Sequence, residues 1–439
     1  MGKARILILG AGLAGLSAAW HLQKIGIDCH IFEKEDQVGG LCRSKNIAGF
    51  CFDYSGHSLH FKNRYIFNLV RSLLGANMIE RQRSAWVYSD SRYIPYPFQA
   101  NLYGLPEKKK SECLSGMLDA FNQNVLTNKK PDNNFLNWII RTFGKGIAKN
   151  FLIPYNTKFW TIAPRQMTCG WIDGFMPVPT ISEMIEGAME DNKREFGYNA
   201  RFWYIKKGGI VNLPNALARG IKNINTGCAV KKIDLKNKEI ILSSGRKDKF
   251  DYLISTIPLP ELSHILKEMP ESLTGKFRKL AWNSIFNLNL GLDINHGLKQ
   301  HWAYFAQKDI SFFRVGYYHN FSPFLTPRKR GSLYIEVSYS KDKPIKKKNL
   351  VKRIKSDLRR VGILNGRKVL VEHINDIKYG YPIYDGYYDA ARKDILGFLR
   401  KKRVIACGRY GSWRYLSMED VILQGRVIAE ELSKCLKKE

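Results

Sequence analysis

The segment Ala4–Glu35, "ARILILGAGLAGLSAAWHLQKIGIDCHIFEKE", decides the fold of this chain. Ile6–Leu9 is a continuous apolar run, which is typical of a strand buried on both faces. Glycines spaced as G-x-G-x-x-G follow at once, then a helical segment to about Lys24 and a second strand that ends on Glu33. A glycine-rich turn between strand and helix, with an acidic residue after the next strand, is the fingerprint of dinucleotide binding.

Each part of this fingerprint has a physical task. Gly10 permits the tight turn, Gly12 lets the backbone approach a pyrophosphate, and Gly15 permits close packing of the helix on the strand. The N-terminus of the helix offers free N–H groups to the phosphates. Glu33 is placed to accept hydrogen bonds from ribose hydroxyls, which favours a plain adenosine ribose over a 2′-phosphate.

The composition indicates a large globular protein. With 439 residues, 44% of them hydrophobic, the chain has room for two or three subdomains. Its formal net charge is +32, and Lys and Arg cluster at 108–110, 341–353, 400–403 and near the C-terminus. Such runs are usually solvated faces, and no zinc-finger or RNA-binding signature accompanies them, so we expect no nucleic-acid partner. Peripheral contact with a membrane stays open.

The cysteines and the apolar segments indicate the compartment. The eight cysteines stand far apart without a C-x-x-C pair, which indicates reduced thiols in the cytosol rather than a disulfide framework or a metal site. The apolar stretch from Ile6 to Trp20 is interrupted by glycines and is shorter than the roughly 20 residues of a spanning helix. We therefore expect a soluble, cytoplasmic protein, and the sequence does not indicate its oligomeric state.

Further motifs narrow the cofactor. The segment "VGGLCRS", Val38–Ser44, has a second glycine pair followed by an arginine. It resembles the signature of the FAD-binding superfamily of amine oxidases and protoporphyrinogen oxidases. Two later segments resemble the parts that complete the FAD domain there: Gly227–Leu259, with strands around a Lys–Asn turn, and 401–432, with a strand, a glycine turn and a last helix. The resemblance implies FAD as the cofactor.

A narrower resemblance covers almost the whole chain. The rigid loop "YIPYPFQAN", Tyr93–Asn101, resembles the W-V-P-Y-P-F-Q-N-N segment of UDP-galactopyranose mutases, especially the eukaryotic type. Further segments resemble that family in the same order, namely Phe52–Phe61, Phe151–Trp171, Phe196–Gly209, Trp302–Val315, Tyr379–Ile383 and Gly408–Tyr415. In that family reduced FAD attacks the sugar through N5 and forms an adduct in which the ring reopens and recloses, without net oxidation. The resemblance implies a nucleotide-sugar substrate and NAD(P)H as the reductant.

The resemblance also implies roles for individual residues. Phe98 and Gln99 would hold the uracil, three tyrosines and Arg314 the diphosphate, and His57 would lie beside the flavin. The residues implied to be catalytic are His57, Tyr304, Arg314, Tyr381, Arg409 and Tyr415. Those implied to bind substrate are Tyr96, Phe98, Gln99, Phe151, Tyr155, Asn156, Trp160 and Asn199. Those implied to bind FAD are Gly10, Gly12, Leu13, Ala14, Gly15, Glu33, Lys34, Gly39, Gly40, Leu41, Arg43, Gly56, His57, Gly408, Arg409 and Met418.

The chain departs from the mutases at two places. Phe175 stands where the family has the second arginine of its diphosphate clamp, and Ser55 replaces the first glycine of the flavin loop. Lys206 and Lys207 could compensate for the arginine. The loss of that charge keeps two alternatives open: an FAD oxidoreductase of the protoporphyrinogen oxidase, amine oxidase or desaturase type, and a flavin-binding protein without catalysis.

The predicted fold is α/β, with a Rossmann-like, discontinuous FAD-binding domain, a helical domain and a substrate-side β-sheet domain. We expect the FAD-binding domain at 1–85, 205–275 and 385–439. The range 100–200 is expected to be mainly helical, as the sequence of 134–152 illustrates, and the sheet domain is expected at 276–382.

Overall fold

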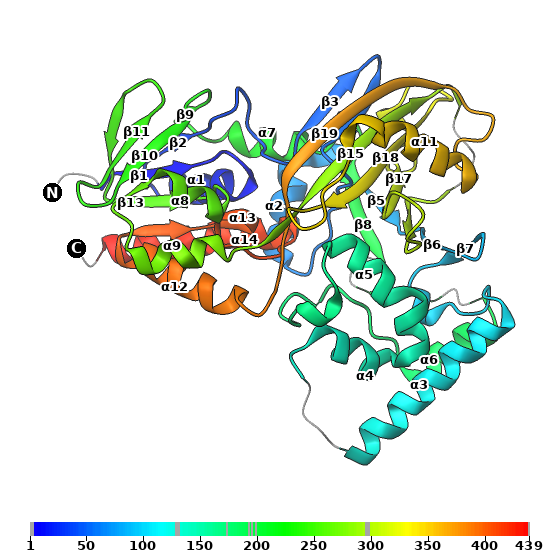
Figure 1. The fold of residues 1–439 in the computed structure, drawn as a ribbon. Coiled ribbons are helices and arrows are strands. Elements are labelled where there is room, and N and C mark those ends of the chain that lie inside the picture. The colour runs from blue at the N-terminus through cyan, green and yellow to red at the C-terminus, as the bar shows by residue number, and fades with distance from the viewer. Residues whose placement is uncertain are drawn as a thin grey trace.

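The computed structural model describes residues 4–127, 132–172, 174–191, 194, 196–197, 200–294 and 299–437. It has the mixed α/β architecture that the sequence predicts (Figure 1). A nucleotide-binding part with a parallel sheet lies on one side of the molecule. A second large sheet and a group of helices lie on the other side, and the chain passes between the parts several times.

The parallel sheet forms the centre of the nucleotide-binding part. In the described chain its strand order is β20 (Val404–Ala406), β13 (Tyr252–Ser255), β1 (Ile6–Leu9), β2 (Cys29–Phe32) and β9 (Ile224–Asn225). All neighbouring pairs are parallel, so the C-terminal ends of these strands meet at one edge. In such sheets ligands bind at that edge.

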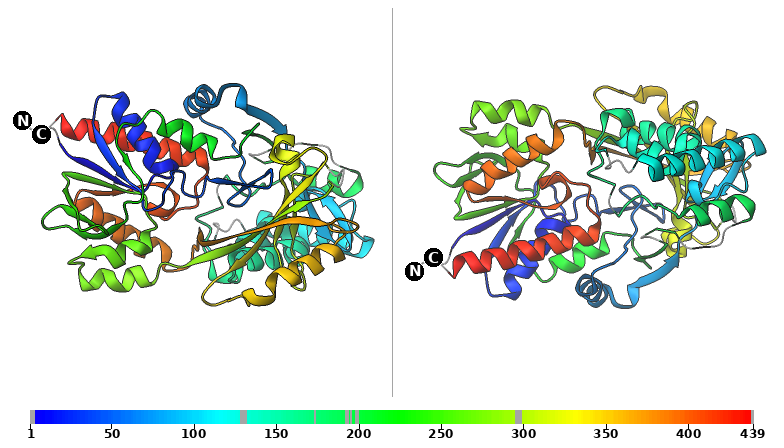
Figure 2. Two further views of the ribbon diagram at one scale, coloured as in Figure 1. Left: turned by 90° about the horizontal axis from the view of Figure 1, so that it is seen from above. Right: turned by 90° about the horizontal axis from the view of Figure 1, so that it is seen from below.

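Helices and a small sheet cover the two faces of the parallel sheet (Figure 2). Ile6 and Ile8 pack into one core with α1 (Leu13–Lys24), α7 (Asn212–Ala218) and α14 (Met418–Leu436). Leu7 and Leu9 point the other way, because side chains alternate along a strand. They share a core with α8 (Leu259–Ile265), α9 (Glu271–Arg278), α12 (Tyr388–Lys401) and the sheet of β10 (Val230–Asp234), β11 (Glu239–Leu242), β12 (Lys247–Lys249) and β14 (Leu266–Lys267).

The second large sheet has seven strands within the described residues. Their order is β19 (Val369–Pro382), β15 (Trp282–Leu292), β18 (Gly331–Tyr339), β17 (Arg314–Tyr317), β16 (Trp302–Phe305), β6 (Ala85–Ser89) and β7 (Arg92–Pro95). Helix α11 (Leu350–Arg360) packs on one face and closes a core with it. The sheet therefore takes two strands from 85–95, which lie outside the range 276–382 predicted for it, because β6 pairs in parallel with β16.

The helical part consists of α3 (Glu107–Thr127), α4 (Phe135–Ile147), α5 (Ile153–Trp160) and α6 (Ile181–Met189). Helices α3 and α4 approach closely at glycines, since a Cβ on Gly144 would lie 2.0 Å from the carbonyl oxygen of Gly116. The segment 134–152 is helical as predicted, but it is not a regular α-helix, because Gly144 has a φ of +78°. The chain forms a wide π-helical turn at Ala148–Leu152, and α5 then begins with Pro154 in its first turn.

The remaining elements connect these parts. They are α2 (Arg64–Leu74), α10 (Tyr318–Phe321), α13 (Gly408–Gly411), and the two-stranded pairs of β3 (Ser44–Ile47) with β4 (Phe50–Asp53) and β5 (Met78–Gln82) with β8 (Arg201–Ile205). None of the helices within the described ranges has the length and apolarity needed to span a membrane.

Candidate functional site

A cavity of about 800 Å³ extends from the C-terminal edge of the parallel sheet to the seven-stranded sheet and α5. This volume lies in the upper part of the range of roughly 300–1,000 Å³ that is common for small-molecule sites. Residues from the glycine fingerprint line one end, and a group of aromatic residues lines the other.

The nucleotide end is built so that backbone approaches backbone. Gly10 has φ +97°, and an added Cβ on Gly40 would lie 3.3 Å from the Cα of Gly12. The N–H of Gly39 donates to the carbonyl of Ala11 over 2.8 Å, which fixes the second glycine pair beside the first. Side chains at these positions would fill the cradle that a pyrophosphate needs.

Glu33 lies at the end of β2 with its carboxylate in this cradle. Its Oε2 accepts a hydrogen bond from the N–H of Ala11 over 2.6 Å, and its Oε1 accepts one from the N–H of Glu35 over 3.0 Å. The carboxylate is thus buried and held in place, but its remaining lone pairs face the cavity that it lines. A carboxylate in this position can accept the hydrogen bonds that the hydroxyls of an adenosine ribose donate.

The residues implied to bind FAD line this cavity with one exception. Gly15 packs behind the turn, where a Cβ would lie 2.0 Å from the carbonyl oxygen of Gly10, as its packing task requires. The cavity is lined by Gly10, Gly12, Leu13, Ala14, Glu33, Lys34, Gly39, Gly40, Leu41, Arg43, Gly56, His57, Gly408, Arg409 and Met418. These residues fit a dinucleotide with its pyrophosphate at the N-terminus of α1.

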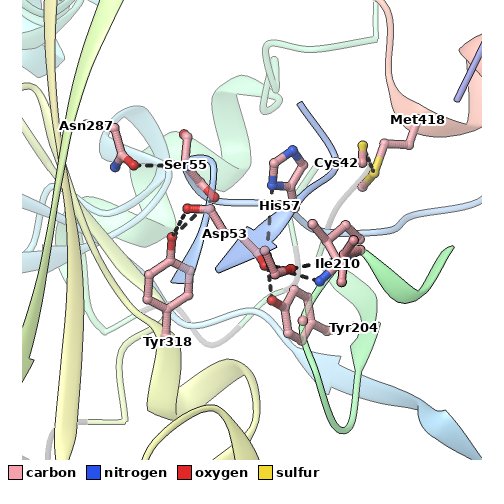
Figure 3. Close-up of polar contacts among 12 residues, drawn as sticks. Cys42, Asp53, Ser55, His57, Tyr204, Ile210, Asn287, Tyr318 and Met418 are labelled. Carbon is pink, nitrogen blue, oxygen red and sulfur yellow. Dashed lines mark hydrogen bonds and ion pairs between the residues drawn. The ribbon is translucent and has the colours of Figure 1, made fainter. Parts of the chain in front are cut away.

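The end of β4 and the loop after it carry a cluster of polar contacts around Asp53 (Figure 3). Asp53 is buried and accepts hydrogen bonds from Ser44 Oγ (2.6 Å), the Tyr204 hydroxyl (2.6 Å) and the N–H of Ile210 (3.1 Å). Burial raises the pKa of Asp53 to about 6, although these hydrogen bonds lower it. The Asp53 carboxylate and its donors therefore anchor the loop that carries His57.

His57 is mostly buried at the middle of the cavity. Its Nδ1 lies 3.9 Å from Asp53 Oδ2 and has no hydrogen-bond partner among the described residues (Figure 3). Burial lowers the pKa of His57 to about 4, and the nearby charges of Arg409 and Arg314 act in the same direction. The imidazole is therefore neutral at pH 7. A buried polar group of this kind is expected to meet a bound molecule.

Aromatic side chains line the other end. Tyr304 lies between Tyr96, with ring centroids 5.2 Å apart, and Tyr155, with ring centroids 5.3 Å apart. Tyr381 and Tyr415 form a further pair at 5.2 Å. Burial raises the pKa of Tyr96, Tyr155, Tyr304 and Tyr415, so their hydroxyls remain protonated donors at neutral pH. Phe151 and Asn156 complete this wall.

Two residues implied to bind substrate lie behind the wall. Phe98 is fully buried and stacks on Phe151 at 5.0 Å, and Trp160 is fully buried against Trp171 at 4.8 Å. The resemblance implies that both residues contact the ligand directly. In the structure they pack behind the residues that line the cavity and support them. Gln99 does line the cavity, and its Nε2 donates to the carbonyl of Pro177 over 2.7 Å. Asn199 lies outside the described residues.

Arg314 reaches the cavity from β17, but its guanidinium is already paired. Nη2 donates to Glu336 Oε1 over 2.8 Å, and Nε donates to Oε2 of the same carboxylate. Burial alone lowers the pKa of Arg314, and the attraction of Glu336 outweighs it, so the pKa is raised well above its ordinary value. Ser55 Oγ also donates to Glu336 Oε1. The expected phosphate clamp is therefore part of a Ser55–Glu336–Arg314 network.

The apolar ring of Phe175 lies at the position where the resemblance implies a second arginine. It lines the cavity and stacks on Tyr415, with centroids 4.2 Å apart and an angle of 28° between the rings. Arg409 lies over Tyr415 at 4.6 Å and over Tyr381 at 4.9 Å, and its Nε is buried without a hydrogen-bond partner in the described chain. Lys206 and Lys207 lie over the Phe324 ring instead of lining the cavity.

Several lining residues cannot be identified from the sequence motifs. The nucleotide end is lined by Cys228, Ala229 and Val230, which belong to a segment that the sequence places in the FAD domain without showing which of its residues contact the cofactor. Tyr334 packs against Gly56, where a Cβ would lie 2.3 Å from the tyrosine hydroxyl. Glu336 was missed too. Its alternation with Tyr334 on β18 was the available signal, because both side chains point to the same face.

Comparison with known proteins shows the family of this chain. The profile of the family described as flavin containing amine oxidoreductase matches residues 13–433, so the chain belongs to that family of flavoproteins. Within it, the fold is that of a UDP-galactopyranose mutase-like flavoprotein. A crystal structure of reduced UDP-galactopyranose mutase superimposes with a TM-score of 0.94 and 27% identity, over 99% of this chain and 95% of that one. We therefore assign FAD to the nucleotide end of the cavity.

Other relatives share the fold or shorter segments. A putative protoporphyrinogen oxidase from Exiguobacterium sp. superimposes with a TM-score of 0.77 at 14% identity, over 98% of this chain and 99% of that one, which shows the fold alone. An uncharacterized protein in the nifH2 3′ region of Methanothermococcus thermolithotrophicus is 44% identical over 59 residues, 13% of this chain and 57% of that protein. Polyamine oxidase 7 of Oryza sativa subsp. japonica is 24% identical over 261 residues, 53% of this chain and 52% of that protein. The match thus spans little more than half of these curated relatives.

Proposed function

We propose that the protein is an FAD-dependent mutase that interconverts the pyranose and furanose forms of a nucleotide sugar. The observation that carries this proposal is the cavity, which joins a flavin cradle to a wall of protonated tyrosines, an amide and Arg314. The match to reduced UDP-galactopyranose mutase over almost the full chain supports it. When bound and reduced, FAD supplies a nucleophilic nitrogen toward the anomeric carbon of the sugar.

The residues of the chain would hold the substrate in place for that chemistry. Tyr155, Tyr304 and Tyr381 line the cavity, and their hydroxyls are donors that would suit the oxygens of a diphosphate. His57 lines the cavity and is neutral at pH 7, so it would add no positive charge beside a bound flavin. The aromatic wall excludes water and so protects a reactive sugar cation from hydrolysis.

A second function is favoured by one specific observation. Phe175 stacks on Tyr415, and Glu336 takes two donors of Arg314, so neither of the two positions expected to clamp a diphosphate offers a free positive charge. An apolar substrate would fit such a wall. This supports the alternative of an FAD oxidoreductase, the chemistry named for relatives such as polyamine oxidase 7.

The decisive experiment uses the FAD-loaded protein and separates the two functions. Enzyme reduced with dithionite, NADPH or NADH is incubated with UDP-galactopyranose and other UDP-hexoses, and products are separated by anion-exchange chromatography. The mutase predicts a furanose product and many turnovers per reductant consumed. We also expect a nicotinamide dinucleotide to replace dithionite.

Matched variants test the site itself. Tyr381→Phe removes a hydroxyl from the cavity wall, and Tyr339→Phe removes one from a surface pair with Asp376. We expect the first to slow conversion by roughly tenfold, the cost of about one hydrogen bond to a charged group, and the second to leave it unchanged. Absence of conversion for every UDP-hexose, together with oxygen uptake that equals product formed from an amine or a polyene, would establish the oxidoreductase. A yellow protein inert in both assays would exclude both enzymes.

A further inference from the structure

The positive charge of the chain is concentrated in one short region. Residues 341–368 contain twelve Lys and Arg and two Asp, a net charge of +10 out of +32 for the whole chain. The region comprises the loop after β18, helix α11 and the turn that leads into β19. We call the exposed cations of this region the basic face.

Helix α11 explains why these cations share a side of the molecule. Leu350, Ile354 and Leu358 are buried against the seven-stranded sheet, one helical turn apart. The opposite side of the helix exposes Lys352, Arg353, Ser356, Arg359 and Arg360. Figure 1 shows α11 against the seven-stranded sheet, on the side of the molecule away from the parallel sheet.

Most cations of the basic face are not neutralised within the protein. Four of the twelve form ion pairs: Lys347 with Asp376, Lys355 with Glu372, and Arg353 and Arg360 with Asp357. By contrast, Lys341, Lys346, Lys348, Lys352 and Arg359 are exposed and have no acidic partner in the described part of the chain. Such like charges repel each other, so an anionic surface would relieve that repulsion.

We propose that the basic face docks the protein on an anionic lipid bilayer. Eight of the twelve cations are lysines, which act as mobile point charges, as in polybasic segments that bind acidic headgroups. Surfaces that bind single-stranded nucleic acid add exposed rings for base stacking. Here the hydroxyl of Tyr339 already donates to Asp376. The ammonium of Lys347 covers the ring of Tyr339, 5.1 Å from the ring centroid. The face therefore offers charge without a stacking platform.

The experiment is co-sedimentation of the full-length, FAD-loaded protein with vesicles. Phosphatidylcholine vesicles with about 30% phosphatidylglycerol are compared with pure phosphatidylcholine, at about 50 mM and about 500 mM NaCl. We expect binding to the anionic vesicles at low salt and its loss at high salt, because salt screens exposed charges. The variant Lys346→Glu/Lys348→Glu/Lys352→Glu should bind at least roughly tenfold more weakly.

A matched variant controls for net charge. Lys108→Glu/Lys236→Glu/Lys402→Glu changes the net charge equally at exposed positions on α3, the β10–β11 turn and the turn after α12. It should bind like the wild type, and both variants should keep the flavin and the unfolding temperature. Equal loss in both variants, or no binding of the wild type to anionic vesicles, would overturn the proposal. Tighter binding of a labelled oligonucleotide than of vesicles, through the same lysines, would replace the lipid with nucleic acid.

Discussion

Arg314 on β17 and Glu336 on β18 stand directly opposite each other in the sheet register, and their side chains form a two-point ion pair at the cavity wall. Glu336 is 1% exposed and Arg314 is 18% exposed. The buried carboxylate is thus fully committed, while the guanidinium keeps one open side. Any anion that binds at this wall must compete with Glu336 for the charge of Arg314.

The first prediction follows from this competition. Glu336→Gln keeps the shape of the side chain but removes the charge that neutralises Arg314. Without ligand the protein should lose about 3 kcal/mol of stability, because a buried cation loses its counter-charge. UDP should bind roughly tenfold more tightly, since the freed charge is worth about one charged hydrogen bond. Calorimetric titration and urea unfolding measure the two effects.

Glu372→Gln, at the surface pair with Lys355, is the control and should change neither quantity. Weaker UDP binding in Glu336→Gln would mean that Glu336 holds Arg314 in its binding position.

The second prediction concerns the backbone at Ser55. Its φ is +76°, a region that favours glycine, and its hydroxyl donates to Glu336. Ser55→Gly relieves about 1 kcal/mol of backbone strain but loses a charged hydrogen bond of about 1.5–3 kcal/mol. Ser55→Ala loses the hydrogen bond and keeps the strain. Stability in urea should therefore fall in the order wild type, Ser55→Gly, Ser55→Ala.

Ser91 provides the matched control for this prediction. It has φ +58° and an exposed side chain in the turn between β6 and β7. Ser91→Gly should stabilise the protein by about 1 kcal/mol, because only the strain changes. If Ser55→Gly stabilises as much as Ser91→Gly, the contact of Ser55 with Glu336 contributes nothing.

The third prediction is a loss of stability in acid. Burial lowers the pKa of His301 and of His319 to about 4. The Nδ1 of His301 accepts the N–H of Ser84 over 3.0 Å, which requires that this nitrogen carries no proton. The Nδ1 of His319 lies 3.1 Å from the N–H and 3.2 Å from the carbonyl oxygen of Ser332, so burial is the cause of its lowered pKa. Unfolding raises each pKa to about 6.5, so the unfolded chain binds more protons between pH 6.5 and pH 4. Stability is complete above about pH 6.5 and falls as the pH drops toward 4, by roughly 2–3 kcal/mol per histidine.

Urea unfolding between pH 7 and pH 4.5 measures this dependence. His301→Gln should remove the share of one histidine and make the dependence shallower, while His30→Gln, at an exposed position of β2, should leave it as in the wild type. Asp53 acts in the opposite sense. Its pKa of about 6 in the fold exceeds the unfolded value, so it favours the fold at low pH and loses that contribution as the pH rises toward 6. An unchanged stability from pH 7 to pH 4.5 would contradict the assignment of neutral buried rings.

The sequence alone predicts contacts between residues that are close along the chain better than contacts between distant segments. The glycine cradle is local, because Gly10, Gly12 and Glu33 belong to one strand–helix–strand unit whose spacing sets the geometry. The rigid loop around Pro97 was recognised, but stiffness does not indicate which side of a loop faces the cavity. Phe98 turned out to pack behind Phe151 for this reason.

Contacts between distant segments required the structure. Glu336 meets Arg314 through the register of two antiparallel strands, which hydrophobic alternation does not specify between partners. The stack of Phe175 on Tyr415 joins the loop before α6 to the loop before α14. The sequence could therefore show that a charge is missing at Phe175, but not that a ring from elsewhere fills its place.

The last prediction tests what that ring does. Phe175→Arg would place a guanidinium at the cavity wall beside Tyr415, at the cost of one aromatic stack worth about 0.5–1.5 kcal/mol. If the aromatic end accepts a diphosphate, the new fork should tighten UDP binding by roughly tenfold to a hundredfold, the value of a charged hydrogen bond of about 1.5–3 kcal/mol. Calorimetric titration with UDP measures it.

Two further variants separate charge from the loss of the ring. Phe175→Leu removes the stack without adding charge, and it should bind UDP no better than the wild type. Phe175→Arg/Arg314→Lys should lose part of the gain, because an ammonium cannot form the two-point contact of a guanidinium. If Phe175→Arg binds UDP no better than Phe175→Leu, the wall does not face a diphosphate. The stacked pair of Phe175 and Tyr415 would then be the contact surface for an apolar substrate, and the oxidoreductase would become the better account of the cavity.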